Sequence, residues 1–167
     1  MRAHMRKIAI LIIALFMIVS GGRTAFALFE IETDNINLEF GVLNIGDWSE
    51  LNERGSYHNE IKCRSDNGNT WYLKVHLIDD FRSGTDVMSC SNLKWKVISV
   101  EGGDGIISNQ GSYTDFSLMP QAVYTSGPAD NNGTEVKIRL SYAISIPRSQ
   151  AAGNYRTTVR YTFTELL

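Results

Sequence analysis

The chain has 167 residues, of which 43% are hydrophobic and 20% charged, and its formal net charge is −2. This length suits a single domain with a hydrophobic core. The acidic balance argues against the broad basic surface that nucleic-acid binding requires, so we expect no nucleic-acid partner.

The first 27 residues have the pattern of a cleaved signal peptide. Basic residues open the chain, an apolar run follows over residues 8–19, and Ala25-Phe26-Ala27 matches a small-residue cleavage site. An uncleaved membrane anchor is the alternative, but the apolar run is shorter than the roughly 20 residues that a spanning helix needs. We therefore predict a signal peptide over residues 1–27 and one mature domain over residues 28–167.

Removal of this segment makes the protein more acidic. It carries four basic and no acidic residues, so the mature chain keeps twelve Lys and Arg against eighteen Asp and Glu, a net charge of −6. No second hydrophobic stretch or lipidation cysteine follows. We expect an extracellular or cell-surface protein that meets a membrane only during export; if the cell is Gram-negative, this means the periplasm or the outer surface.

Cys63 and Cys90 are the only cysteines. In an exported chain an even number of cysteines favours a disulfide, which stabilises a fold by roughly 3–4 kcal/mol in the chain-entropy view. Two buried free thiols are the alternative. A redox or zinc site is disfavoured, since no C-x-x-C motif and no nearby histidine pair is present. The sequence predicts a Cys63–Cys90 disulfide.

The first part of the mature chain alternates apolar and polar residues with the period of a β-strand. Residues 28–34 show this alternation, and its parity changes over residues 36–40, which indicates a bulge or a passage between two sheets. Residues 41–56 look irregular, with one short extended piece. Residues 57–63 form the next predicted strand.

The middle of the chain begins with a turn at Asn67-Gly68, because this pair readily adopts the positive φ of tight hairpins. A strand over residues 70–78 follows, with Trp71, Leu73, Val75 and Leu77 on one face. Another strand is predicted over residues 93–100 and a weaker one over residues 113–119. Residues 79–86 and 120–134 are expected to be loops.

The last part of the chain has the clearest alternation, over residues 135–146, and Pro147 ends it. After a turn, residues 155–164 alternate again. Seven or eight short strands separated by turn signals predict an all-β fold, an antiparallel immunoglobulin-like β-sandwich in a single domain. A closed barrel is the second choice.

Residues that could support catalysis are few in the mature chain. His58 and His76 are its only histidines, and His76 is expected on the outward side of a strand beside Lys74. Asp79-Asp80 fits loop polarity better than a carboxylate pair, since adjacent residues rarely converge on one site. No nucleophile elbow or phosphate loop is present. We predict no catalytic residues and no cofactor, so the protein is not expected to be an enzyme.

Two loops, residues 66–69 and 130–135, are rich in side-chain oxygens of the kind that bind calcium. Neither has the spacing of a calcium-binding loop, and Asn-Gly turns explain both compositions, so no metal site is predicted. Trp48 has no aliphatic neighbours in phase with it. It is expected either to cap the end of the sandwich or to offer an aromatic platform to a glycan.

The last two strands, residues 135–146 and 155–164, are expected to form a hairpin. Its outer face would then carry a group of cations that we predict as a partner-contact face: Lys137, Arg139, Arg156 and Arg160. Like charges on neighbouring strands repel each other, so acidic side chains should lie alongside. The N-terminal strand can supply them as a strand-pairing edge: Glu30, Glu32 and Asp34. Pairing within one molecule would seal the sheet edge, whereas pairing with the next molecule would make a polymer.

Short motifs resemble those of bacterial surface β-sandwiches. "LEFGVLNIG" before a cysteine-containing strand resembles spore-coat-U-like proteins and fimbrial subunits, and "SDNGNTWYLKV" with "NLKWKV" resembles a WxL domain, with Trp71-Tyr72-Leu73 as its W-x-L. The ending, with a proline, a loop and Ala152-Gly153-Asn154-Tyr155 before a strand, is similar in all these groups. The resemblance implies an exported β-sandwich at a cell surface and, for the WxL type, binding to peptidoglycan.

These observations predict an exported, non-catalytic, structural or adhesive surface protein. A subunit of a surface layer or fimbria-like assembly is its most specific form, with other surface proteins or further copies of the chain as partners. The alternative is a binding module for a cell-wall polymer or glycan, contacted by Trp48 and the outward cations.

Overall fold

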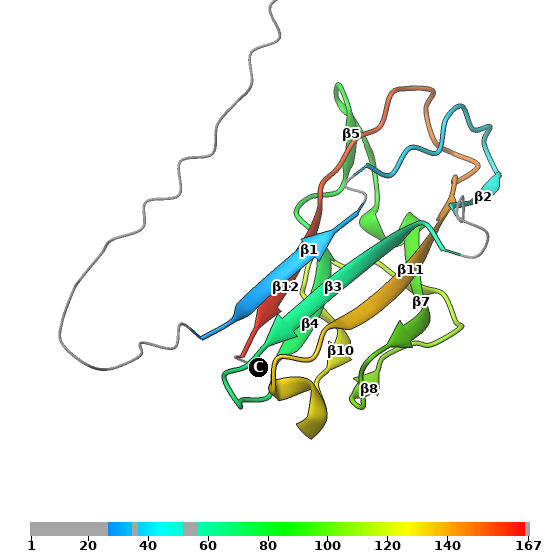
Figure 1. Cartoon of the computed structure of the whole chain (residues 1–167). Helices are drawn as coiled ribbons and strands as arrows, with labels where there is room; N and C mark the ends of the chain where they lie inside the picture. Colours follow the sequence, from blue (N-terminus) through cyan, green and yellow to red (C-terminus); the bar gives the residue numbers. More distant parts are fainter. Residues whose placement is uncertain (1–26, 35–36, 52–56, 166–167) are drawn as a thin grey trace, which may run out of the picture.

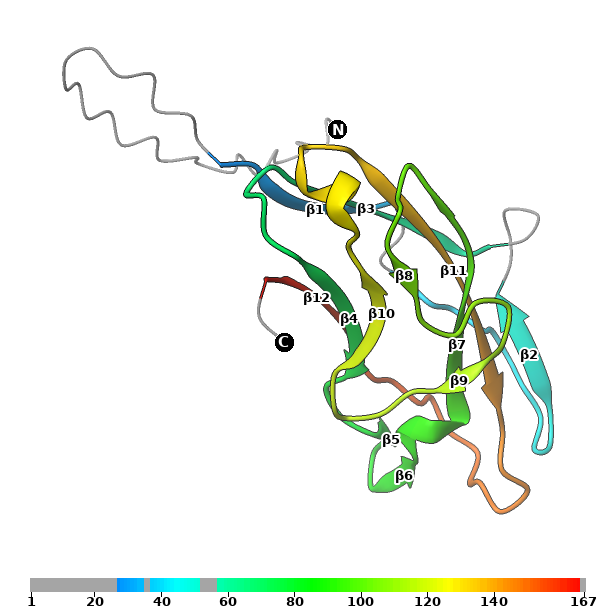
Figure 2. The ribbon, with the colours of Figure 1, turned by 90° about the horizontal axis from the view of Figure 1, so that it is seen from below.

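A computed structural model describes residues 27–34, 37–51 and 57–165 (Figure 1). Two antiparallel sheets face each other, and Figure 2 shows them as two layers, so the predicted all-β sandwich is confirmed. The signal peptide lies outside the described residues, apart from Ala27, and stays a prediction. In the described part of the chain, no helix has the length and hydrophobicity to cross a membrane.

The larger sheet is organised around one long central strand, β11 (Val136–Ser145). Along one side of β11, its first half pairs with β3 and its second half with β2, while β7 pairs along the other side. Strands β1 and β9 form the two ends of the sheet. The bounds of these strands are β1 (Phe29–Thr33), β2 (Trp48–Leu51), β3 (Asn59–Ser65), β7 (Leu93–Glu101) and β9 (Thr114–Asp115).

The smaller sheet has the order β12-β4-β10-β8. Its strands are β4 (Tyr72–Leu77), β8 (Ile106–Ile107), β10 (Gln121–Thr125) and β12 (Val159–Thr164). A separate hairpin and two short 3-10 turns complete the described elements: β5 (Phe81–Ser83), β6 (Asp86–Met88), η1 (Cys90–Asn92) and η2 (Pro128–Asn131).

The core lies between the sheets and is formed by the alternation seen in the sequence. The predicted inward residues of β4 are all 0% exposed: Trp71, which directly precedes the strand, with Leu73, Val75 and Leu77. Trp95 and Val97 on β7 face them from the larger sheet and are equally buried. Gly68 has a φ of +75°, as the predicted Asn-Gly turn requires. These predictions are confirmed.

Several short elements were not predicted. The β5–β6 hairpin begins within residues 79–86, which were expected as a loop, and ends at Met88; residues 120–134, also expected as a loop, contain β10 and η2. In β10 the register shifts between Ala122 and Tyr124, so the neighbours Val123 and Tyr124 are both buried. This bulge interrupts the two-residue period, and the sequence pattern therefore gave no strand signal.

Asp130 holds together one end of the sandwich. Its side chain is 0% exposed and accepts hydrogen bonds from the Tyr124 hydroxyl (2.6 Å) and from the backbone N–H groups of Gly127 (2.8 Å) and Asp104 (3.0 Å). A carboxylate is an acceptor-only group that can serve several donors at once. Asp130 therefore joins η2 to β10 and to the loop that follows β7.

A tyrosine pair links the two sheets. The hydroxyl groups of Tyr142 on β11 and Tyr161 on β12 are hydrogen-bonded to each other, and Tyr142 also donates to Asn59 Oδ1 (2.8 Å). Burial raises the pKa of Tyr161 to about 12, although part of its side chain reaches the surface. Burial also raises the pKa of Tyr142 well above its usual value.

The predicted disulfide is wrong, because Cys63 and Cys90 are free thiols at opposite ends of the larger sheet. Cys63 pairs with Val136 at the start of β11, whereas Leu93, which follows η1, pairs with Ile144 near its end. Eight residues of extended strand span about 27 Å. A disulfide requires Cα atoms within about 7 Å of each other. The even cysteine count carried no information about this separation.

We expect the two thiols to differ in reactivity. In the native protein a maleimide should modify Cys90, which is half-buried, and leave Cys63 unmodified, because Cys63 is 0% exposed and burial raises its thiol pKa to about 12. Mass spectrometry of non-reduced protein should show one adduct before denaturation and two after it. A mass lower by two hydrogens, with no adduct after denaturation, would restore the disulfide.

Candidate functional site

The last two long strands do not form the predicted hairpin. Strand β11 lies in the larger sheet, and β12 lies in the smaller sheet with β4 as its partner. The two strands have the same inward alternation whether they are neighbours or face each other across a core, so the pattern could not decide between these arrangements. The connection over residues 146–158 is long enough to pass from one sheet to the other.

The predicted partner-contact face is therefore divided between opposite surfaces. On the larger sheet, Arg139 forms ion pairs with Glu60 (2.9 Å) and Glu101, and Lys137 pairs with Glu135 (3.6 Å). These cations are neutralised by acidic residues close to them. Arg156 and Arg160 belong to the smaller sheet, where their surroundings are different.

The outer surface of the smaller sheet forms a basic face. We use this name for the side chains that the chain pairing places together there: Lys74, His76, Arg82, Arg156 and Arg160. Arg160 pairs with His76 across β12 and β4, and burial together with the positive charge of Arg160 lowers the pKa of His76. The alternation of the sequence predicts outward positions for Lys74 and His76, whereas Arg82 lies in β5, within a segment that the sequence predicts as a loop.

The acidic N-terminal strand pairs with β3, so the prediction that it lies beside the last strand as a sheet neighbour is wrong. Glu30 lies opposite Arg64 and Glu32 opposite Lys62, and Asp34 Oδ1 accepts a hydrogen bond from the backbone N–H of Glu60 (2.8 Å). Strand β3 carries cations at the positions that match these glutamates, so it meets the charge requirement that the last strand was expected to meet. The pairing is intramolecular in this structure.

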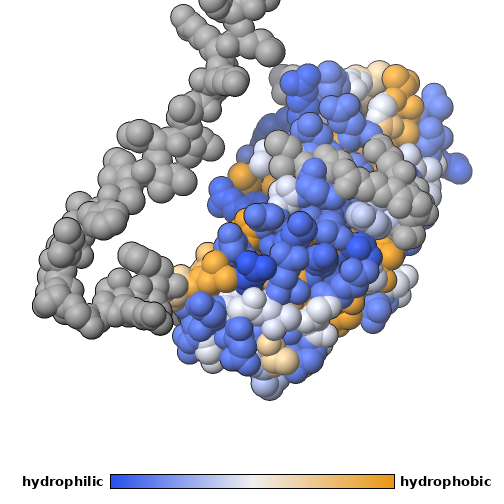
Figure 3. Space-filling view, viewed as in Figure 1, coloured by the Kyte–Doolittle hydropathy of each residue, from blue (hydrophilic) through white to orange (hydrophobic). Residues whose placement is uncertain are grey.

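Strands β1 and β12 nevertheless meet at one side of the sandwich, which we call the open edge. Each is the last strand of its own sheet, they overlap in Figure 1 and lie at the same side of the two layers in Figure 2, and the rings of Phe29 and Phe163 stack with their centroids 4.1 Å apart. Phe29 and Ile31 are 40% and 41% exposed although they point toward the core. Figure 3 shows hydrophobic surface on the side of the molecule where β1 begins. The core is only partly covered here.

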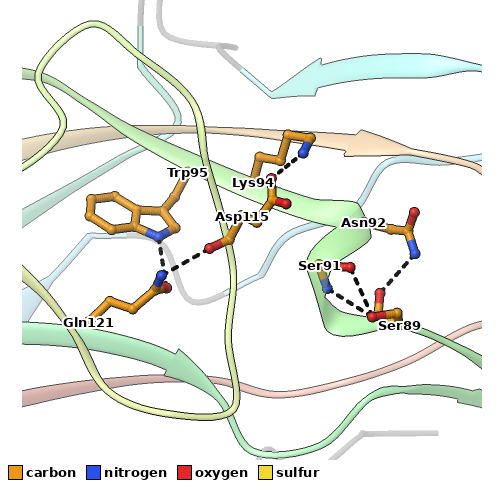
Figure 4. A network of polar contacts seen from close by, with 7 residues as sticks. All are labelled: Ser89, Ser91, Asn92, Lys94, Trp95, Asp115 and Gln121. Carbon is orange, nitrogen blue, oxygen red and sulfur yellow. Dashed lines mark hydrogen bonds and ion pairs between the residues drawn. The ribbon is translucent and has the colours of Figure 1, made fainter.

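The opposite side of the sandwich is closed by polar contacts (Figure 4). Trp95 Nε1 on β7 donates to Gln121 Oε1 on β10 (3.3 Å), and Gln121 Nε2 donates to the backbone carbonyl of Asp115 on β9 (3.1 Å). Asp115 also forms an ion pair with Lys94. These bonds connect the larger and smaller sheets on this side, where Trp95 is 0% exposed, whereas Phe29 and Ile31 at the open edge remain 40% and 41% exposed.

Trp48 lies on the outer surface of the larger sheet, away from the open edge. It is 48% exposed, meets the ring of Tyr113 edge-on with centroids 5.5 Å apart, and donates from Nε1 to Glu50 (3.2 Å). The ammonium group of Lys96 lies 4.1 Å from the centroid of the Tyr113 ring. Trp48 thus belongs to a small exposed aromatic cluster and does not close the end of the core.

Among the described residues, no group of three or more His, Cys, Asp and Glu side chains is arranged to hold a metal ion. Comparison of the chain with protein-family models and with curated proteins finds no match.

Proposed function

We propose that this protein is an exported, non-catalytic β-sandwich that serves as a structural or adhesive subunit at the cell surface. In this proposal it associates with further copies of itself through the open edge. The observation that carries the proposal is the meeting of two terminal strands, β1 and β12, over a core that Phe29 and Ile31 only partly cover.

Terminal strands expose backbone N–H and C=O groups along one side, and another strand can pair with them. Soluble proteins usually protect such strands with prolines, bulges or inward-pointing charges. Strand β12 pairs with β4 in an uninterrupted register from Val159 to Thr164, contains no proline, and points Tyr161 and Phe163 inward. It therefore offers a flat edge to a strand from a second molecule.

The charges near the open edge also suit a second copy. The outward residues of β1 include Glu30 and Glu32, and those of β12 include Arg160. When β1 of one copy lies beside β12 of another, acidic and basic side chains become cross-strand neighbours, which is stabilising by about 0.2–1 kcal/mol for each pair. Such a contact joins two different strands, β1 of one copy and β12 of the next, so each copy keeps one free strand and the assembly can continue from copy to copy.

The mature chain, residues 28–167, tests this proposal. We expect its mass in solution, measured by light scattering after size exclusion, to rise with concentration, and Ile31→Lys to keep it monomeric, because the new charge would be buried by strand addition. Val42→Lys is the matched control, since it makes the same kind of change at a residue that is 98% exposed and outside the open edge.

Circular dichroism should show that both variants keep the wild-type strand content. A wild-type protein that stays monomeric at its highest soluble concentration would contradict the proposal. The same conclusion would follow if Ile31→Lys and Val42→Lys assembled equally well.

A second function, binding to a cell-wall polymer or glycan, is supported by the exposed Trp48–Tyr113 pair, since aromatic rings stack well on sugar faces. Retention of the protein on purified cell wall that is lost in Trp48→Ala, without self-assembly, would favour this function over the first.

A further inference from the structure

We propose that the basic face binds phosphodiester groups of an extended anionic polymer, with Arg82, Arg156 and Arg160 as its contacts. This site goes beyond the proposed self-association, because it lies on the outer surface of the smaller sheet and does not require the free edge of β12.

Arg82 and Arg156 are direct cross-strand neighbours. The backbone N–H of Arg82 donates to the carbonyl of Arg156 (3.0 Å), and that of Arg156 donates to the carbonyl of Arg82 (3.1 Å). Two like charges in this position repel each other. Both arginines are exposed, and among the described residues neither forms an ion pair. An external anion between the two guanidinium groups would remove this repulsion.

A hollow of about 240 Å³ lies at this arginine pair, and it is lined by Asp79, Asp80, Arg82, Arg156, Thr157 and Thr158. The Asp80 carboxylate is already engaged, because its Oδ1 accepts the backbone N–H of Cys90 (2.7 Å). The Thr157 hydroxyl donates to the Asp79 backbone carbonyl (2.6 Å). Asp79 and Asp80 both carry carboxylates that oppose an anion in this hollow, and among the described residues the Asp79 side chain is the one of the two that accepts no hydrogen bond.

The cations continue along the chain beyond the hollow. Arg160 has the same outward orientation as Arg156, four residues further along, which corresponds to about 13 Å of extended strand. The exposed Thr158 lies between them. Positive charges spaced along a strand fit a polymer that carries repeated anionic groups better than they fit one small ion.

Phosphodiesters suit the arginine pair because their charge is shared by two non-bridging oxygens, one for each guanidinium group. Arginine binds such oxygens through charge-assisted hydrogen bonds of fixed geometry. Cations of the larger sheet have different surroundings, because Arg64, Lys137 and Arg139 all form ion pairs with glutamates of the same molecule. Arg82, Arg156 and Arg160, which form no ion pair in the described part of the chain, thus lie together on the basic face.

The test measures binding of poly(glycerol phosphate) to the mature chain by isothermal titration calorimetry. We expect Arg82→Gln with Arg156→Gln to weaken binding about tenfold or more and Arg160→Gln to weaken it by a smaller factor. Arg64→Gln with Lys137→Gln is the matched control, because it removes the same charge from the larger sheet, where both cations pair with Glu135. This control should bind like the wild type.

Two further measurements make the proposal specific. Asp79→Asn should strengthen binding, since it removes one opposing carboxylate from the hollow. Poly-glutamate of equal charge should bind more weakly than poly(glycerol phosphate). Equal binding of the two polymers, unchanged binding by the Arg82/Arg156 variant, or an equal loss in the Arg64/Lys137 control would overturn the proposal.

The expected binding of the polymer to the basic face does not depend on self-association through the open edge. Ile31→Lys, which should abolish assembly, should retain polymer binding, and the Arg82/Arg156 variant should retain its concentration-dependent mass. Failure of one proposal can therefore be recognised while the other holds.

Discussion

Replacing Asp130 with alanine is expected to lower the free energy of unfolding by about 3–5 kcal/mol, because each buried donor left without a partner costs about 1–3 kcal/mol. Three donors lose their acceptor at once: the Tyr124 hydroxyl and the backbone N–H groups of Gly127 and Asp104. Urea denaturation followed by tryptophan fluorescence measures this loss. Few single substitutions have an effect of this size.

Two variants control for this prediction. Asp130→Asn keeps the volume of the side chain but turns an amide group toward the donors. We therefore expect its free energy of unfolding to lie between those of the wild type and Asp130→Ala. Asp104→Ala makes the same truncation at an exposed residue of the same end of the sandwich, and it should cost less than about 1 kcal/mol. Equal effects of the Asp104 and Asp130 truncations would show that the buried carboxylate is not the stabilising group.

Raising the pH from 9 to 12 is expected to destabilise the protein strongly. Burial raises the pKa of Cys63 from 9.0 to about 12 and that of Tyr161 from 10.0 to about 12. The folded protein therefore holds protons that the unfolded chain releases, so stability is complete below pH 9 and falls as the pH rises toward 12. A displacement of two pKa units corresponds to about 3 kcal/mol for Tyr161. The free energy of unfolding at several pH values measures this slope.

Variants assign the alkaline slope to particular groups. Tyr161→Phe removes one titrating hydroxyl and its bond to Tyr142, so it should be less stable at neutral pH but lose less stability between pH 10 and 12. Cys63→Ala should flatten the slope from pH 9 upward. If a variant with both Tyr161→Phe and Cys63→Ala loses stability with pH as steeply as the wild type, these two groups do not cause the alkaline slope.

The sequence predicted those parts of the fold in which alternation was regular. Trp71, Leu73, Val75 and Leu77 were correctly placed in the core, because every second residue near β4 is apolar and the strand has no bulge. Strand β10 was missed because its bulge places Val123 and Tyr124, which are adjacent, both inside. A bulge within a strand as short as β10 therefore hides it from the local pattern, whereas the longer β7 and β11 were predicted although their pairing contains a register shift.

Long-range arrangement was the weaker part of the prediction. The inward alternation of β11 and β12 is compatible with pairing or with facing across the core, and only the sheet order distinguishes these arrangements. The separation of Cys63 and Cys90 along β11 is likewise a property of strand register. Of the candidate contacts, the exposed Trp48 corresponds to one of two alternatives that the sequence left open. The cross-strand pair of Arg82 and Arg156 was not predicted, since it depends on how the chain continues beyond β4 and before β12.

The central position of β11 has a consequence for the order of events during synthesis. Its pairing partners β2, β3 and β7 lie between Trp48 and Glu101, whereas β11 itself begins at Val136. The larger sheet thus cannot assemble until most of the chain has left the ribosome. Folds dominated by such distant pairings form slowly, in milliseconds to seconds. If the N-terminal segment directs export, this delay keeps the chain extended for long enough to enter a narrow translocation pore before its sheets close.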